Sequence, residues 1–418
     1  MMQRSNFLVG VILVIWFVIS FVTNIMGPLM PIVIETYKLN LTMAAFLPFS
    51  FFLAYGVMSI PAGIMTERLG GKRAMLIAFA LNFIGALAIV LYPVYAVALA
   101  SLFIIGIGMA MLQVIINPLM RVAGGEEHFA FYSVLAQLIF GAGSFVSPFV
   151  FTYMMEGLSS PVQGNGFLNL FSSLVNGDMH WTALYGLFTM IFVLIFVLLF
   201  TIKIPKVELK DDEKSGTGAV YLDLLKDKKV ILFFFGIVAY VGTEQAIANW
   251  MSQFLKQYHN IDPTTQGATA IAWFWGLMSI GCLLGLVFLK LFDSKWVLKT
   301  AAVLALTAIS LALFGSSAVS YYAFMTCGFT ISVMFSIIFS LALNSISAHH
   351  GSFSGILCSG IFGGALVPLL VGALGDWVGL RYAMIILYAT VGYILYLAYY
   401  AQPLIANKTV KLKELFKL

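Results

Sequence analysis

Long apolar runs separated by short polar breaks fill most of the chain. A helix needs about 17–25 mainly apolar residues to cross a lipid bilayer, and twelve runs reach that length. They cover residues 7–34, 43–66, 74–95, 97–120, 130–155, 181–202, 230–255, 266–289, 300–317, 319–346, 353–374 and 382–402. Strands of a membrane barrel are only about ten residues long and alternate apolar with polar positions. The pattern therefore predicts twelve transmembrane helices.

One polar break carries far more charge than the others. Residues 203–229 contain the stretch KDDEKSGTG, a composition typical of a flexible linker. This break lies between the sixth and seventh apolar runs. We therefore expect an all-α membrane protein with one six-helix bundle at 1–202, a linker at 203–229 and a second six-helix bundle at 230–418.

Basic residues are distributed unevenly between the two sides of the predicted bundle. If successive helices alternate in direction, all but three of the 22 Lys and Arg residues fall on the side that holds both chain ends. The exceptions are Lys38, Lys256 and Arg381. Cytoplasmic loops of membrane proteins carry such an excess of Lys and Arg, so we expect both termini in the cytoplasm.

The composition excludes a soluble protein. Only 9% of the residues are charged and 61% are apolar, whereas a soluble domain has about 25% charged residues. Membrane lipid must therefore cover the surface, and the net charge of +5 reflects the basic side rather than a nucleic-acid partner. The three cysteines form no C-x-x-C pair and the five histidines fall in loops or at helix ends, so we expect no metal site.

A short motif occurs twice, with the same spacing of small, acidic and basic residues. The two copies are Gly63-x-x-x-Glu67-x-x-Gly70-x-Lys72 and Gly372-x-x-x-Asp376-x-x-Gly379-x-Arg381. The first follows the second helix and the second follows the eleventh, so they lie on opposite sides of the membrane. That arrangement is typical of inverted internal repeats in transporters.

One carboxylate lies deep in an apolar run. Of the 17 acidic residues, all but Glu244 fall in loops or near helix ends. A charge in the middle of a membrane costs several kcal/mol unless it is paired or neutralised, and no Lys or Arg lies inside a predicted span. We expect Glu244 to carry a proton or to bind a cation, as an ion-coupling residue; the alternative is a protonated glutamate that only stabilises the bundle.

Neutral hydrogen-bonding side chains accompany Glu244 in the predicted spans. The candidates for substrate binding are Asn24, Gln113, Asn117, Gln137, Gln245, Asn249, Trp250 and Asn344. Amides that both donate and accept, together with an aromatic face, suit the hydroxyl groups and C–H surface of a sugar. The alternative is that these amides join helices to one another, with about 0.6 kcal/mol from each hydrogen bond.

Several segments resemble a known family of membrane transporters. Residues 63–73 (GIMTERLGGKR) resemble the loop motif of the major facilitator superfamily, with Glu67 at the usual aspartate position and Gly71 where a basic residue is common. Residues 103–124, 134–148, 240–250 and 339–372 resemble the fucose permease family of sugar symporters. The resemblance implies the two-bundle fold, a conformational role for the loop motif and alternating access. The loop-motif residues are Gly63, Glu67, Arg68, Gly70, Lys72 and Arg73.

The chain departs from the proton-coupled members of that family at two positions. Those members carry an aspartate near the end of the first helix and a glutamate four residues before an Asn-Pro pair in the fourth. Here the corresponding residues are Gly27 and Gln113. The proton mechanism therefore does not transfer directly, which favours sodium slightly over protons as the coupling cation.

These observations predict a monomeric, cation-coupled transporter that takes up a hexose-type sugar across a bacterial inner membrane, with no cofactor besides Na⁺ or H⁺. Drug efflux by the same fold is the first alternative, and it predicts an apolar cavity. An intramembrane enzyme is disfavoured because an aspartyl protease needs two carboxylates and only one lies within a span. The sequence does not specify which sugar or which cation is transported.

Overall fold

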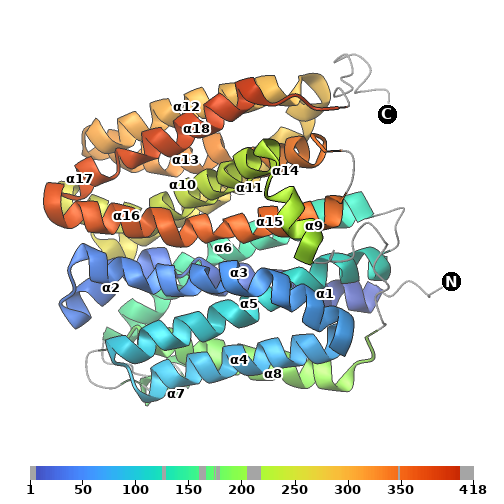
Figure 1. Ribbon diagram of the computed structural model, residues 1–418. Coiled ribbons are helices and arrows are strands. Elements are labelled where there is room, and N and C mark those ends of the chain that lie inside the picture. Colours follow the sequence, from blue (N-terminus) through green and yellow to red (C-terminus); the bar gives the residue numbers. More distant parts are fainter. Residues whose placement is uncertain are drawn as a thin grey trace.

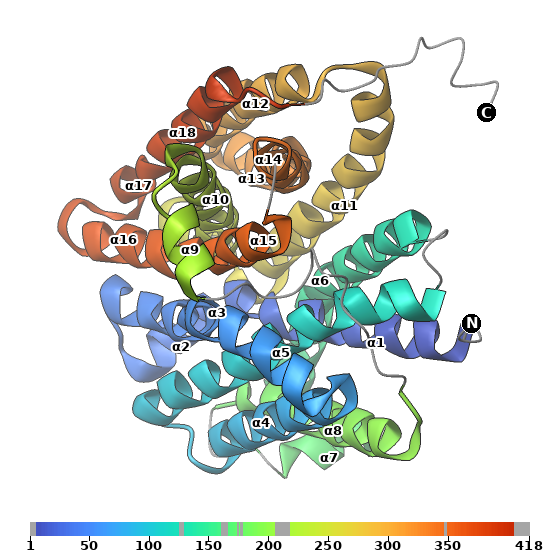
Figure 2. The same ribbon diagram turned by 45° about the vertical axis from the view of Figure 1, so that its right-hand side comes forward.

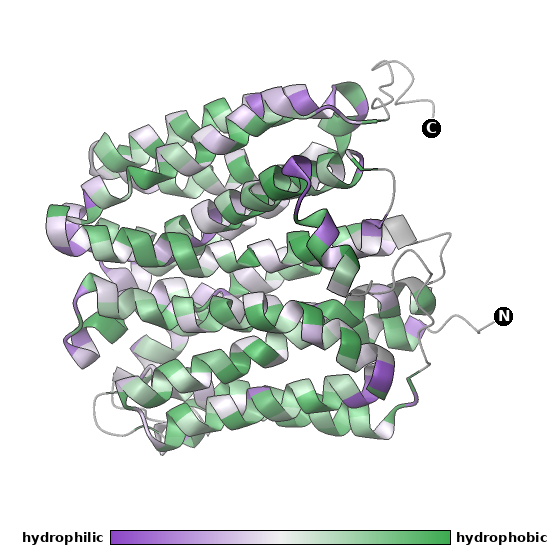
Figure 3. Cartoon of the chain, in the orientation of Figure 1, coloured by the Kyte–Doolittle hydropathy of each residue, from purple (hydrophilic) through white to green (hydrophobic). Residues whose placement is uncertain are grey.

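The computed structural model describes residues 6–124, 129–159, 166–173, 175, 179–204, 218–346 and 349–404. The regular elements of this described part are all helices, and they include twelve helical spans long and apolar enough to cross a membrane. The predicted number of transmembrane helices is therefore confirmed. The most hydrophilic residues gather at the two ends of the bundle, while the spans between them are mostly apolar (Figure 3).

Spans one to six form the first half of the molecule. Their helices are α1 (Asn6–Thr23), α2 (Met26–Tyr37), α3 (Leu41–Leu69), α4 (Gly71–Leu91), α5 (Tyr95–Gly124), α6 (Phe129–Ser159), α7 (Gly166–Ser172) and α8 (Thr182–Thr201). Here α1 and α2 together make span one, and α7 is a short helix between spans five and six.

Spans seven to twelve form the second half. Their helices are α9 (Gly218–Leu224), α10 (Lys228–His259), η2 (Pro263–Gly267), α11 (Ala268–Leu291), α12 (Ser294–Phe314), α13 (Ser317–Ile331), α14 (Met334–Leu343), α15 (His350–Ser359), η3 (Gly360–Phe362), α16 (Gly363–Val378), α17 (Leu380–Ala383) and α18 (Ile386–Tyr400). Figures 1 and 2 show this group of helices above the first half.

The buried apolar side chains form two clusters that largely follow the two halves. One cluster takes its residues from spans one to six, with Ala268 and Ala365 from the second half. The other takes its residues from spans seven to twelve, with Met30, Ala44 and Ala45 from the first half. These five residues mark where the halves pack together. The predicted linker at 203–229 stays a prediction, because residues 205–217 lie outside the described part.

Several spans that appear continuous in the sequence are interrupted, spans one and ten among them. Span one turns at Asn24 and Ile25. Pro28 lies four residues after Asn24; its ring crowds the carbonyl of Asn24, and it has no N–H to donate to that carbonyl. Span ten turns at Ser332 and Val333, where the Ser332 hydroxyl donates to the carbonyl of Phe329 (2.8 Å). A serine that bonds its own helix in this way competes with the regular backbone pattern.

The end of the bundle that holds Lys72, Lys229 and Lys295 is called the basic end here, and the other is the opposite end. Each of these lysines donates to backbone carbonyls where another helix ends: Lys72 to Phe200 (3.0 Å), Lys229 to Ser345 (3.4 Å) and Lys295 to Ala401 (2.5 Å). The last carbonyls of a helix lack partners within it and favour a nearby cation. These lysines therefore stabilise helix ends, in addition to contributing to the excess of positive charge on this side of the bundle.

Candidate functional site

Glu244 lies at the middle of α10, sixteen residues after its first residue, Lys228. The hydroxyl of Tyr240 donates to Oε2 (2.6 Å), and the amide of Gln245 donates to Oε1 (3.1 Å). Tyr240 is one helical turn before Glu244, so the two side chains share a face of α10. Both carboxylate oxygens therefore have a donor, and neither donor carries a charge.

The surroundings of Glu244 come from α11 and from the interrupted span ten. The ring of Tyr240 packs against Phe335 of α14, with centroids 5.7 Å apart. Cys282 of α11 donates its thiol to the carbonyl of Ser332 at the break in span ten (3.2 Å), and it lies within electrostatic reach of Glu244. A partly exposed carboxylate beside a broken helix can hold a proton or a small cation, as such breaks do in other transporters.

The other candidate residues of α10 are buried more deeply. Gln245 is buried beside Gly364 of α16, where α16 packs on α3 of the first half. Asn249 is buried one turn further along, and within the described part its amide nitrogen has no hydrogen-bond acceptor. Trp250 has no exposed surface, and its indole N–H donates to the carbonyl of Pro368 (3.1 Å). The structure thus places Trp250 in the core of the second half, out of reach of a substrate in this conformation.

Two amides of the first half lie on different helices. Asn24 occupies the break in span one, and its amide donates to the hydroxyl of Ser144 on α6 (2.7 Å). Its own oxygen is buried with no donor among the described residues, so it could accept a substrate hydroxyl if the site opened. Gln113 is half-buried on α5.

Three further candidates have different positions. Gln137 is exposed on α6. Asn344 follows the last residue of α14 and accepts the N–H of Leu404 through its carbonyl (2.8 Å). Because α14 has ten residues and a helix rises about 1.5 Å per residue, Asn344 is far from Glu244, near the basic end. The side chain of Asn117 lies outside the described part.

Gln137 and Glu244 flank one crossing between the halves. A methyl group on Gly141 of α6 would overlap the hydroxyl of Ser279 on α11, so these helices touch there. Gln137 is one turn from Gly141, and Cys282 is about one turn from Ser279, both toward the basic end. Gln137 of the first half and the Glu244 environment of the second half therefore lie at a similar depth.

The sequence analysis missed Tyr240 as the partner of Glu244. Its position four residues before Glu244 was a sufficient signal, because residues at that spacing meet on a helix face. The break in span ten gave no comparable signal, since the residues around Ser332 are apolar and include no proline.

The loop-motif residues lie at the basic end, in the last turns of α3, the turn at Gly70 and the first turn of α4. Gly70 has a positive φ of 80° with ψ 151°, and Gly379 in the second copy of the motif has φ 83° and ψ 152°. Glycine is favoured at such angles, so both copies make the same turn. Gly63 lies within α3; Arg68 and Arg73 are exposed. The side chain of Glu67 lies outside the described part.

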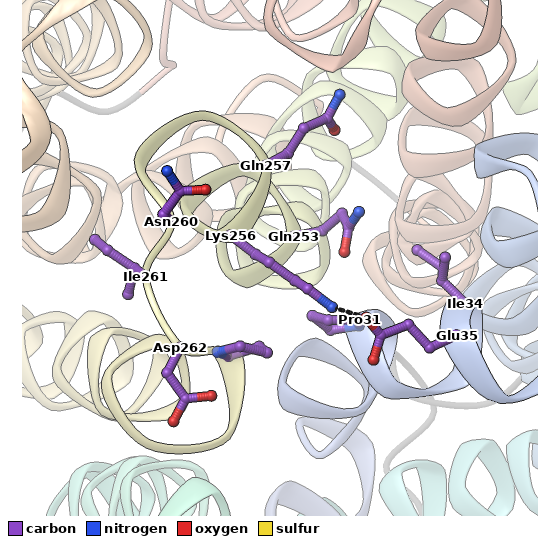
Figure 4. Close-up of a pocket in the computed structure, with 10 residues that line it drawn as sticks. Pro31, Ile34, Glu35, Gln253, Lys256, Gln257, Asn260, Ile261 and Asp262 are labelled. Atoms are coloured by element: carbon purple, nitrogen blue, oxygen red, sulfur yellow. Dashed lines mark hydrogen bonds and ion pairs between the residues drawn. The ribbon is translucent and has the colours of Figure 1, made fainter.

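A separate pocket of about 630 Å³ lies at the opposite end, between α2, α10 and the segment leading to η2. Its lining includes Glu35, Gln253, Lys256 and Asp262. Lys256 of α10 pairs with Glu35 of α2 across the pocket (Figure 4). This pocket does not include Glu244, so it is distinct from the candidate site in mid-membrane.

Comparison with known proteins decides the family. Residues 12–360 match the family model described as Major Facilitator Superfamily. The chain belongs to the major facilitator superfamily. This superfamily member is a multi-pass integral membrane transporter and not an enzyme, as the sequence predicted.

Curated relatives of this superfamily member cover nearly its whole length. A glucose/galactose transporter of Brucella abortus is 28% identical over 424 residues, which cover 97% of this chain and 96% of the relative. The L-fucose-proton symporter of Escherichia coli is 23% identical over 382 residues, covering 87% and 86%. A crystal structure of the E. coli fucose:proton symporter matches with a TM-score of 0.66 at 21% identity, covering 94% and 98%. The resemblance to the fucose permease family is thus confirmed, and the predicted fold with it.

Proposed function

We propose that the protein takes up a hexose-type sugar across a bacterial inner membrane, by alternating access and coupled to a cation. The observation that carries the proposal is the match, over nearly the full length of both chains, to a relative named glucose/galactose transporter. The amides near mid-membrane agree with it, because sugar hydroxyls need groups that both donate and accept. The basic end faces the cytoplasm in this proposal, as the excess of Lys and Arg there indicates.

The sugar site in this proposal lies between the two halves. It is on the side of the α6–α11 crossing that faces the basic end. Gln137 and Gln113 contribute from the first half, and Gln245 from the second. Substrate sites of such transporters lie near the midplane, at the interface between the repeats. Asn24 borders the site from the other side of this crossing, beside Ser144, and offers an oxygen that has no donor among the described residues.

Glu244 is the coupling residue in this proposal. Within the described spans it is the carboxylate at mid-depth, and both of its oxygens already accept hydrogen bonds. A proton or a sodium ion that binds there changes the charge next to Gln245, which links ion occupancy to the sugar site. Sodium is slightly favoured, because Gly27 and Gln113 occupy the carboxylate positions of the proton-coupled family members.

Counterflow in proteoliposomes tests the substrate class without any need for coupling. Liposomes loaded with unlabelled glucose, galactose or fucose are diluted into trace labelled sugar, and transient accumulation of label is measured. We expect counterflow for at least one hexose and none for a lipophilic cation. Counterflow of the lipophilic cation alone would favour the efflux alternative instead.

A further inference from the structure

A polar contact joins the two halves at the opposite end of the bundle, far from the proposed sugar site. Asp376 lies near the end of α16, beside the first residues of α3 from the other half. Its carboxylate accepts hydrogen bonds from the backbone N–H groups of Leu41 (2.8 Å) and Thr42 (3.0 Å), and from the hydroxyl of Thr42 (2.5 Å). Asp376 therefore caps a helix that belongs to the other half.

The start of α3 requires such an acceptor. The first N–H groups of a helix have no partner within the helix, and a carboxylate near them is favoured by the helix dipole and by charge-assisted hydrogen bonds. The side chain of the chain's own cap, Asn40, accepts the N–H of Met43 (2.8 Å). The remaining N–H groups of the first two residues depend on a carboxylate from the second half.

Close packing of small residues accompanies this cap. A Cβ on Gly372, one turn before Asp376, would lie 2.6 Å from the carbonyl oxygen of Leu41 and 2.8 Å from Cβ of Ala45. A Cβ on Gly27 of α2 would overlap the carbonyl of Ala248 on α10. Small residues allow membrane helices to approach closely, so the halves are in tight contact at this end.

Two other polar contacts cross between the halves at the same end. Lys256 pairs with Glu35, and the hydroxyl of Thr152 donates to the carbonyl of Thr264 (2.6 Å). The ion pair joins two partly exposed side chains, and such pairs contribute little on average. Asp376 is also exposed, but its contact differs because one carboxylate combines three hydrogen bonds with a helix start.

We propose that Asp376 is the latch that keeps the opposite end closed in this conformation. To open that end, α3 must move away from α16, which breaks all three hydrogen bonds and leaves the first N–H groups of α3 without this acceptor. The second copy of the repeated motif thereby gains a role: it supplies a carboxylate that biases the transporter toward the state open at the basic end.

Cysteine accessibility in the full-length protein tests the latch. The three native cysteines, Cys282, Cys327 and Cys358, are first replaced by alanine. Met30→Cys then places a single reporter cysteine at the contact between the two halves, since Met30 is buried and packs with the second-half cluster. A membrane-impermeant maleimide is added from the side of the opposite end. We expect Asp376→Asn to accelerate labelling about fivefold. The amide keeps one acceptor oxygen but removes the negative charge, and loss of a charge at a helix start and of charge-assisted hydrogen bonds shifts the balance by roughly that factor.

Asp293→Asn is the matched control. Asp293 caps α12 by accepting from the N–H of Lys295 (2.9 Å), but it acts within the second half and at the basic end. It should leave the labelling rate unchanged. Thr42→Val removes only the hydroxyl contact and should give a smaller acceleration, so the comparison holds even if Asp376→Asn does not fold.

An unchanged labelling rate in Asp376→Asn would overturn the proposal; if only Thr42→Val folds, an unchanged rate in that variant would do so. An equal acceleration of labelling in Asp293→Asn would also overturn it. The test needs no sugar, so it stands even if the proposed substrate is wrong.

Discussion

At the scale of single residues, Glu244 and Trp250 lie six positions apart on α10 but have different surroundings. Glu244 is partly exposed and hydrogen-bonded by Tyr240 and Gln245, whereas the indole of Trp250 is fully buried against Pro368. The first arrangement suits a group that changes its charge during transport. The second suits a group that holds two helices together.

Trp250→Phe should therefore destabilise the protein without changing its substrate affinity. The substitution removes the N–H that satisfies the Pro368 carbonyl and leaves a small void, at a cost of about 1–3 kcal/mol. Thermal unfolding in detergent should show a lower midpoint, while counterflow per folded molecule should keep its half-saturating sugar concentration. Trp296→Phe, at an exposed indole, is the control. A large loss of sugar affinity with normal stability would return Trp250 to the binding site.

Tyr240→Phe should strengthen cation binding at Glu244. The ring keeps its contact with Phe335, but Oε2 of Glu244 loses its donor, and a carboxylate with fewer hydrogen bonds attracts a cation more strongly. Since a hydrogen bond to a charged group contributes about 1.5–3 kcal/mol, the half-saturating concentration of the coupling cation should fall roughly tenfold. Uptake measured against cation concentration checks this.

Tyr393→Phe is the matched control for that measurement, because Tyr393 donates to the carbonyl of Leu232 (3.0 Å) in the same half. If both tyrosine variants give the same cation dependence as the unmodified protein, the Tyr240 hydroxyl has no part in coupling.

The sequence was sufficient to find Glu244 but not to orient the residues around it. A lone carboxylate in an apolar run is visible from composition alone. The direction of Trp250 depends on the rotation of α10 about its axis, and a helix that is apolar on nearly every side has no polar stripe that fixes this rotation. Asn344 is a different case, because it lies two residues from the end of the predicted span 319–346 and its depth alone separates it from the mid-membrane amides.

At the scale of helices, the twelve spans were predictable because their length and apolar content exceed what any other structure needs. The helix crossings were not predictable, since they depend on where small residues from distant spans meet. Gly27 shows this. The sequence marks it as a missing carboxylate, whereas the structure shows that α2 approaches the backbone of α10 at this position.

Gly27→Ala should impair transport by separating α2 from α10. The added methyl group would overlap the carbonyl of Ala248 and lie 3.1 Å from Ile271, which disfavours the closed opposite end. We expect a several-fold lower rate of sugar uptake, measured in proteoliposomes at equal protein content. Gly10→Ala is the control, because nothing lies within 4 Å of the added methyl group there. Equal rates in the two variants would show that this helix approach is not needed for transport.

At the scale of the whole molecule, the two halves behave as two packed bodies in contact at the opposite end. Their contacts include the Asp376 cap at that end and the crossing of α2 with α10 at Ala248, one turn from Glu244 at mid-depth. This arrangement agrees with the proposed latch at Asp376, which favours opening at the basic end. In the proposed mechanism, ion occupancy at Glu244 drives sugar accumulation, and this is the central claim.

Gradient-driven uptake by Glu244→Gln tests that claim most directly. Glutamine keeps the size and much of the hydrogen bonding but cannot bear the charge. In proteoliposomes with an imposed sodium gradient at constant pH, and separately with a proton gradient, the unmodified protein should concentrate labelled hexose under one of them. The variant should fail to concentrate it under either, yet retain part of the counterflow. If Glu244→Gln still concentrates sugar with unchanged ion dependence, Glu244 is not the coupling residue and the account is wrong.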